Sequence, residues 1–187
     1  MQHHHFLTTI FSPTDFSESE LALIIPLFKP IKFAKNDFLL KEGKIESNYW
    51  FLESGFIRSF VIDSNGNDIT THFYSTGDVV IDWASFFLRS PTRENIQALS
   101  ECVCWQLDFD NFQRLFHNIE TFREHGRRRL VSSYFALKSH SVAIIAEQAK
   151  DACGFRPILV EGIIRDLGAQ PSRDAHCNIC IFNPDPI

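Results

Sequence analysis

The chain has 187 residues, of which 44% are hydrophobic, and its formal net charge at pH 7 is -5. This length predicts one folded domain with an appendage, because a second full domain would have too few residues. The acidic balance excludes a protein whose whole surface attracts nucleic-acid phosphates and leaves room only for a local basic patch. No apolar run is long enough to cross a bilayer, and the first residues lack the pattern of a signal peptide. We therefore expect a cytoplasmic protein without a membrane partner.

The first predicted helix begins at a capping box. Ser17 and Glu20 have the Ser-x-x-Glu spacing in which each residue satisfies a backbone donor of the other. Pro26 is expected to kink or end this helix, because proline lacks a backbone donor. The sequence therefore predicts a short helix over about 17–28, preceded by an N-terminal extension over 1–16. Apolar residues at helical spacing follow the cap: Leu21, Leu23, Ile24 and Leu27.

A series of short segments rich in aromatic and β-branched residues follows, and glycines separate them. Glycine adopts the positive φ that tight corners between strands need. Asn65-Gly66 is the strongest hairpin signal of the chain. Eight short strands within 17–118 predict an antiparallel double-sheet β-roll, a jelly roll, and with the flanking helices the fold class is α+β. The predicted strands are 31–33, 38–41, 49–53, 56–63, 68–74, 78–81, 94–99 and 103–107, and the separating glycines are Gly43, Gly55, Gly66 and Gly77.

From Asp108 onward the apolar residues recur at helical spacing. Asp108 is a suitable cap for a helix, and a longer helix is expected over 119–150. The narrow apolar stripe of this long helix predicts the interface of a homodimer, although packing against the chain's own roll explains the stripe nearly as well. The residues expected at the interface are Phe122, Leu130, Leu137 and Ile144.

Two stretches of the chain resemble a known family. Gly43–Arg58 (GKIESNYWFLESGFIR) and Pro91–Leu99 (PTRENIQAL) resemble, in order and spacing, the cyclic-nucleotide-binding roll of Crp/Fnr-type transcription regulators. Trp50 stands where that family usually has tyrosine. The resemblance covers about 17–147. It implies an effector-sensing domain that binds a small molecule, dimerises through the long helix and passes pocket occupancy to a DNA-reading domain.

The resemblance also implies a ligand site in the loop between the sixth and seventh predicted strands. Members that hold cyclic AMP use a short helix, a glycine–glutamate pair and an arginine that neutralises the phosphate. Here Asp82 stands near the place of the glutamate, the arginine position falls on Thr92, and Arg93 follows one residue later on the opposite face. Cyclic AMP is thus one candidate effector. The expected ligand-binding residues are Asp82, Trp83, Ser85, Thr92, Arg93 and Asn95.

Residues that hold metals or form catalytic centres are sparse. The five cysteines form no disulfide framework, and Cys102 and Cys104 alternate on a predicted strand as small core residues. His72 stands alone on its strand, whereas a metalloenzyme roll needs several histidines and a carboxylate. We expect no catalytic residues, no metal and no cofactor. Two alternatives stay open, a cupin-like metal-dependent small-molecule enzyme and a free-standing ligand-binding module.

The last segment, 151–187, departs from the family pattern. A helix-turn-helix needs two amphipathic helices around a short turn, and prolines and glycines interrupt this segment instead. We therefore expect an irregular tail. One hypothesis is that a frameshift has replaced the DNA-binding domain with out-of-frame sequence, in which case the DNA binding expected of the family is lost or damaged.

Overall fold

The computed structural model describes residues 5–11 and 15–146, and within α5 it leaves the side chains at 136, 137 and 140–146 undescribed. The chain divides into two compact units, Met1–Arg123 and Glu124–Ile187. The predicted tail over 151–187 lies outside the described residues. In chain order the elements are α1 (His5–Ile10), α2 (Glu18–Ile24), the 3-10 helix η1 (Ile25–Leu27), β1 (Lys29–Phe33), β2 (Phe38–Leu40), β3 (Asn48–Ser54), β4 (Ile57–Ile62), β5 (Asp68–Tyr74), β6 (Val79–Val80), α3 (Trp83–Leu88), β7 (Asn95–Ala98), β8 (Cys102–Asp108), α4 (Phe109–Asn118) and α5 (Glu120–Ala146).

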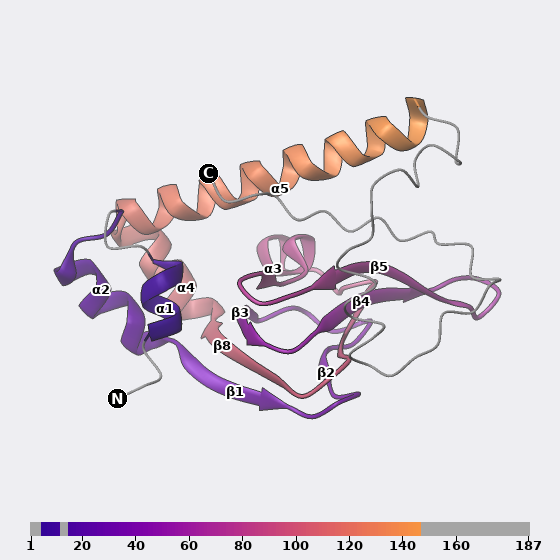
Figure 1. The fold of residues 1–187 in the computed structure, drawn as a ribbon, viewed down its shortest axis with the longest axis horizontal. Helices are drawn as coiled ribbons and strands as arrows, with labels where there is room; N and C mark the ends of the chain where they lie inside the picture. The colour runs from indigo at the N-terminus through magenta and orange to yellow at the C-terminus, as the bar shows by residue number, and fades with distance from the viewer. Residues whose placement is uncertain (1–4, 12–14, 147–187) are drawn as a thin grey trace. The chain divides into compact units, whose positions relative to one another are not determined.

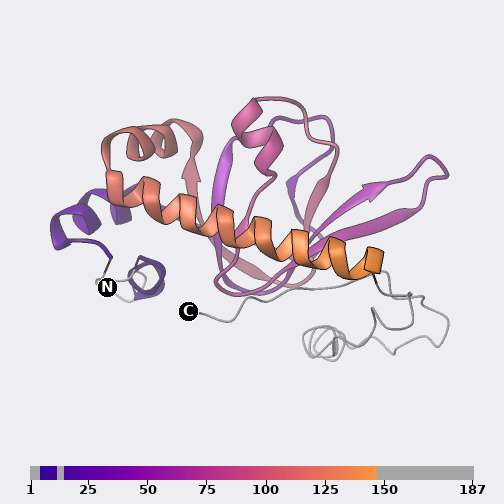
Figure 2. The same cartoon turned by 90° about the horizontal axis from the view of Figure 1, so that it is seen from above.

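The eight strands form two antiparallel sheets of four, with the orders β1-β8-β3-β6 and β2-β7-β4-β5. In Figure 2 the strands of the two sheets surround a common interior. β3 pairs with β8 along most of its length, where Trp50 lies opposite Gln106 and Leu52 opposite Cys104. The predicted α+β fold with an antiparallel double-sheet β-roll is therefore confirmed.

Local signals account for the corners of the roll. At the β4–β5 hairpin Gly66 has a φ of 85°, and the carboxylate of Asp63 accepts the backbone N–H groups of Asn65 and Asn67, each at 2.8 Å. A residue with positive φ at this place is what the Asn-Gly pair predicts. The predicted capping box is also present, and the backbone N–H of Ser17 donates to the Glu20 carboxylate at 2.9 Å. Pro26 lies in η1, so the helix that begins after Ser17 loses its α-helical geometry at the proline.

One core cluster fills the inside of the roll. Its members come from strands of both sheets, and most of them are aliphatic. Cys102 and Cys104 are buried among them as free thiols, in the core position that the strand alternation predicts. The buried members are Leu40, Trp50, Leu52, Ile57, Tyr74, Val80, Ile96, Ala98, Cys102 and Cys104.

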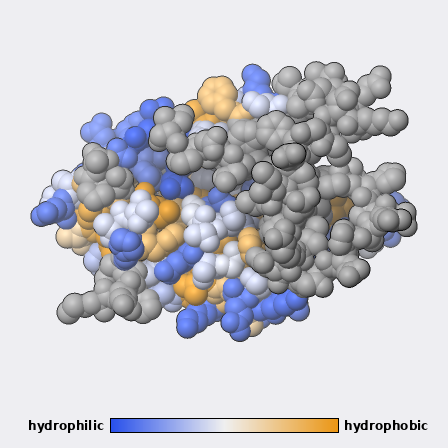
Figure 3. Space-filling model, viewed as in Figure 1, coloured by the Kyte–Doolittle hydropathy of each residue, from blue (hydrophilic) through white to orange (hydrophobic). Residues whose placement is uncertain are grey.

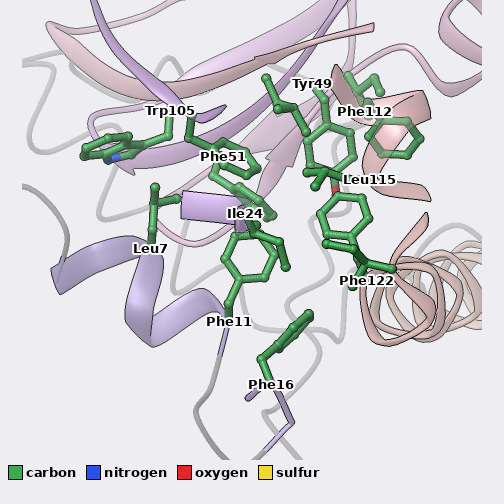
Figure 4. Packing of buried hydrophobic residues seen from close by; sticks show 14 of the residues in the cluster. Leu7, Phe11, Phe16, Ile24, Tyr49, Phe51, Trp105, Phe112, Leu115 and Phe122 are labelled. Carbon is green, nitrogen blue, oxygen red and sulfur yellow. The ribbon is translucent and has the colours of Figure 1, made fainter. Parts of the chain in front are cut away.

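A second core cluster lies on the outer face of the sheet that contains β3 and β8, under the helices (Figure 4). Phe51 points from β3 into this cluster and contacts Phe11. The ring centroid of Phe11 lies 5.4 to 5.6 Å from those of Phe16, Phe28 and Phe51. Tyr49 stacks on Phe112 of α4 at 5.3 Å. Helices α1, α2 and α4 lie together at one end of β1 and β8 (Figure 1). This cluster holds the helical part of the first unit on the roll.

Two short helices were not expected from the sequence. The first is α1, within the predicted N-terminal extension, and it contributes Leu7 to the second core cluster next to Phe11, both fully buried. The second is α3, which follows β6 inside the segment predicted as a loop. Each has six residues, so neither shows the repeated apolar stripe by which longer helices are recognised.

The long helix α5 begins at Glu120, one residue after the predicted start. Phe122, however, does not lie at a surface that a partner could cover. Phe122 is 5% exposed and packs in the second core cluster against Phe112, at 5.7 Å between ring centroids. We therefore withdraw Phe122 from the predicted dimer interface, since its side chain is already covered by its own chain. Leu130 is exposed, and the side chains of Leu137 and Ile144 lie outside the described residues.

Among the described residues no helix combines the length and the apolar character that crossing a membrane requires.

Gly55 provides a test of the corner between β3 and β4. Its φ is 96°, and an added Cβ would lie 2.6 Å from the sulfur of Cys102 and closer still to the backbone oxygen of Glu101. Gly55→Ala should therefore lower the free energy of unfolding by about 3 kcal/mol or more, through backbone strain and overlap with a rigid carbonyl. Gly66→Ala has a similar φ with open space around it and should lower that free energy by only about 1 kcal/mol. Urea unfolding of both variants measures the difference, and equal losses would contradict the close approach at Gly55.

Candidate functional site

Helix α3 begins at one end of the roll, directly after the buried strand β6. Asp82 is its N-cap, and the Asp82 carboxylate accepts the backbone N–H of Ser85 at 3.1 Å. An N-cap aspartate satisfies one of the backbone donors that have no partner at the start of a helix. The helix ends at Arg89, whose φ of 54° places it in the left-handed region. A capping residue and a left-handed residue thus set the two ends of this short helix.

Thr92 connects the segment after α3 to the start of the helix and to the loop before β3. Its hydroxyl donates to the second carboxylate oxygen of Asp82 at 2.5 Å and accepts the backbone N–H of Glu94 at 3.0 Å. Its backbone N–H donates to the carbonyl of Lys44 at 2.8 Å, and its own carbonyl accepts the N–H of Gly43 at 2.9 Å. Thr92 is 4% exposed, so all of these polar groups are paired inside the fold.

Glu46 lies in the same loop and is buried, with 1% of its surface exposed. Its backbone N–H donates to the Ser85 hydroxyl at 2.8 Å, and that hydroxyl donates to the carbonyl of Ser90 at 2.6 Å. One oxygen of its carboxyl group, Oε1, accepts the backbone N–H of Asn48 at 2.9 Å, while Oε2 is buried without a hydrogen-bond partner. Burial raises the pKa of the Glu46 carboxyl to about 7, and the charge of Asp82 adds to the rise.

The guanidinium of Arg89 secures the loop from the other side. Nη1 donates to the carbonyl of Glu46 at 2.6 Å, and Nη2 donates to the hydroxyl of Ser47 at 3.3 Å. The guanidinium carbon lies 4.0 Å from the centre of the Phe109 ring, a cation–π contact. Both the N–H and the C=O of Glu46 are therefore held by groups from α3 or its end. We call Glu46, Asp82, Ser85, Arg89, Thr92 and Glu94 the α3 cluster.

Polar groups also line the wall of β4 and β5 near this end. The hydroxyls of Tyr74 and Ser59 are 3.1 Å apart, and the ring of His72 lies 4.5 Å from that of Tyr74. Burial raises the pKa of Tyr74 far above its ordinary value, and it lowers the pKa of His72. Burial also raises the pKa of Glu94, with a further contribution from the charge of Asp82. The neutral forms of the buried Tyr74 and the half-buried Glu94 are thus favoured, and the same direction holds for His72.

The structure brings together three of the six residues expected to bind a ligand. Asp82, Ser85 and Thr92 meet in the α3 cluster, as described above. The other three are not part of this cluster, and their role in ligand binding stays a prediction. Trp83 stacks on Phe87 at 6.0 Å, Arg93 is exposed, and the amide oxygen of Asn95 accepts the backbone N–H of Glu42 at 3.1 Å.

Sequence reasoning missed Glu46, Arg89 and Glu94. Glu46 is 39 residues from Ser85 and 43 from Arg89, so their contacts appear only when the roll closes. One signal was available for Glu94, because it lies two residues after Thr92 in the stretch that carried the resemblance. No comparable local signal marks Arg89, which follows an unrecognised helix.

A hollow of about 290 Å³ borders the loop before β3. It is lined by residues 38–41 and 44–48, from the start of β2 to the start of β3, and Glu46 is one of them. Within the described part of the chain no group of three or more histidine, cysteine, aspartate or glutamate residues is arranged to hold a metal ion. The α3 cluster offers hydrogen-bonding and charged groups to a ligand.

Comparisons with known proteins agree with this architecture. Residues 30–118 match the family model of the cyclic nucleotide-binding domain. A clustered mitochondria protein homolog from Caenorhabditis elegans is 32% identical over 114 residues, which cover 58% of this chain and only 9% of that protein. The similarity thus concerns a small part of the relative.

Two solved structures share the fold at low sequence identity. The sensor domain of the transcriptional regulator DNR from Pseudomonas aeruginosa has a TM-score of 0.58 and 12% identity, covering 70% of this chain and 87% of that one. The regulatory subunit of a cAMP-independent protein kinase A from Trypanosoma brucei has a TM-score of 0.57 and 16% identity, covering 68% of this chain and 46% of that one. Residues 30–118 therefore form a domain of the cyclic nucleotide-binding fold.

Proposed function

We propose that this chain carries the effector-sensing domain of a transcription regulator of the Crp/Fnr type, with the α3 cluster as the place where a small molecule is read. The observation that carries the proposal is the convergence of the loop before β3, helix α3 and the segment before β7 on a few shared hydrogen bonds. Glu46 and Thr92 each join two of these segments. A ligand that replaces one of these bonds would change the relative stability of the joined segments and shift their population.

The charges of the cluster disfavour a cyclic nucleotide as the natural effector. A cyclic nucleotide carries an anionic phosphate, which needs a cationic partner when it is removed from water. Thr92 occupies the position that the resemblance assigns to that cation, and its hydroxyl is bonded to Asp82. Arg93, the neighbouring cation, is exposed. The proposed effector is therefore a small molecule other than cyclic AMP.

The proposal includes a homodimer formed through α5. Leu130 and Tyr134 are one helical turn apart, and they are 44% and 57% exposed. Val131 and Phe135 extend the same exposed apolar strip by one residue each. Large apolar side chains gathered on one helix are typical of a surface that a partner covers. On the face that Figure 3 shows, the visible hydrophobic and hydrophilic residues are interspersed.

A substitution at Thr92 tests the site. Thr92→Arg places a guanidinium beside Asp82, and a charge-assisted bond to phosphate contributes about 1.5–3 kcal/mol. We expect this variant to bind cyclic AMP at least about tenfold more tightly than the natural sequence, as measured by titration calorimetry. Ser64→Arg adds the same charge at the exposed β4–β5 hairpin and should change nothing. A folded Thr92→Arg variant that gains no affinity would remove the α3 cluster as the effector site.

Charged substitutions in α5 test the dimer. Leu130→Asp combined with Tyr134→Asp should convert the dimer to a monomer, because carboxylates are costly to bury between helices. Ser132→Asp adds a carboxylate to an exposed position on another side of α5 and should leave the dimer intact. Sedimentation velocity of the three proteins measures the outcome. A monomeric natural sequence would contradict this part of the proposal.

A further inference from the structure

The α3 cluster contains more acidic than basic side chains. The charge of Asp82 contributes to the raised pKa of Glu46 and of Glu94, which places the three carboxyl groups within electrostatic reach of one another. The positive charge of Arg89 acts in the opposite direction and lowers the pKa of Glu46. Its two terminal nitrogens, however, donate to the backbone carbonyl of Glu46 and to the hydroxyl of Ser47, which are neutral groups. The cluster therefore has carboxyl groups that no guanidinium or ammonium group bonds.

The second observation is the unpartnered oxygen of Glu46. Its Oε2 atom is buried without a hydrogen-bond partner, and only 1% of the surface of Glu46 is exposed. Buried polar atoms are rarely left unpaired, and each such atom in a folded protein calls for an explanation. Glu46 also borders the hollow of about 290 Å³ next to its loop. A donor arriving from that hollow would satisfy Oε2.

We infer that the α3 cluster receives the cationic group of a small molecule, an ammonium or a guanidinium, and that the Glu46 carboxyl group is its partner. The inference rests on the proposed function, since it names the chemical class of the effector for the same site. Both kinds of group carry several N–H donors and no acceptor, which suits a set of carboxyl groups. The lysines that border the hollow, Lys41 and Lys44, are exposed, and the ammonium group of Lys41 lies 4.7 Å from the centre of the Phe38 ring.

Binding of a cation has a consequence that binding of a neutral molecule lacks. With a pKa of about 7, Glu46 is largely protonated at pH 6. A cationic partner favours the carboxylate, so the carboxyl group gives its proton to the buffer as the N–H···O bonds form. The charge of the ligand thus replaces the charge of the proton inside the site. The same cation would also ease the repulsion between Glu46 and Asp82.

The experiment compares two probes of nearly equal shape, n-butylguanidinium and neutral n-butylurea. We expect titration calorimetry at pH 6 to show millimolar binding of n-butylguanidinium and at least about tenfold weaker binding of n-butylurea. Repeating the titration in two buffers of different ionisation enthalpy should show release of up to about one proton per site. Equal affinity for the two probes, or binding without proton release, would overturn the inference.

Two variants separate a role of Glu46 from a general effect of charge. Glu46→Gln keeps the shape of the side chain and should lose both the proton release and at least about tenfold in affinity for n-butylguanidinium. Glu42→Gln removes an exposed carboxylate from the same loop and should retain both the proton release and the affinity.

The outcomes also separate the inference from the proposed function. If n-butylguanidinium does not bind while Thr92→Arg gains affinity for cyclic AMP, the cation inference fails and the proposed function stands. If n-butylguanidinium does not bind the natural sequence and Thr92→Arg does not gain affinity for cyclic AMP, the inference and the proposed function both fail. Glu46→Gln and Glu42→Gln are informative only if the natural sequence binds n-butylguanidinium. The comparison of n-butylguanidinium with n-butylurea on the natural sequence therefore tests the inference even if Glu46→Gln does not fold.

Discussion

The burial of Glu46 is the constraint on which the proposed site depends. Its backbone N–H and C=O are both held by α3 or the residue that ends it, so the carboxyl group cannot turn to water without loosening the loop from the helix. Ser85 and Arg89 provide those two bonds, and Asp82 and Thr92 attach the same helix to the segment before β7. One end of the roll is thus closed by polar contacts, whereas the remainder is held by the two apolar clusters.

The buried carboxyl group makes the stability of this end depend on pH. The pKa of Glu46 in the folded chain, about 7, lies above its ordinary value of 4.5, so folding favours the protonated form. The stabilisation from that form is fully present below about pH 4.5, and it is lost as the pH rises through 7. Deprotonation leaves a charge near Asp82 in a site with little water, and this charge is what a cationic ligand would compensate. Ligand binding and proton binding are therefore expected to compete at Glu46.

Most of the fold could be predicted because its signals are local, and much of the site could not because its contacts are distant. The Asn65-Gly66 turn, the Ser17 cap and the strand alternation that buries Cys102 and Cys104 each depend on neighbouring residues. Glu46 becomes important only through bonds to residues about forty positions away. The position of Phe122 could not be predicted for another reason. An apolar residue on a helical stripe gives the same sequence pattern whether the core of its own chain or a partner chain covers it. Thr92 is buried and Arg93 is exposed, but both precede β7, so strand alternation does not account for the exposure of Arg93.

The most direct measurement is the titration of the Glu46 carboxyl group in the intact chain, followed by carbon-13 NMR with Glu46→Gln used to assign the resonance. The buried arrangement predicts a midpoint near pH 7. It also predicts that the backbone amide of Glu46 exchanges faster with solvent above that midpoint, because the loop is then held less firmly. A midpoint near the ordinary value of 4.5, with amide exchange at Glu46 unaffected between pH 6 and pH 8 after correction for intrinsic rates, would contradict the account.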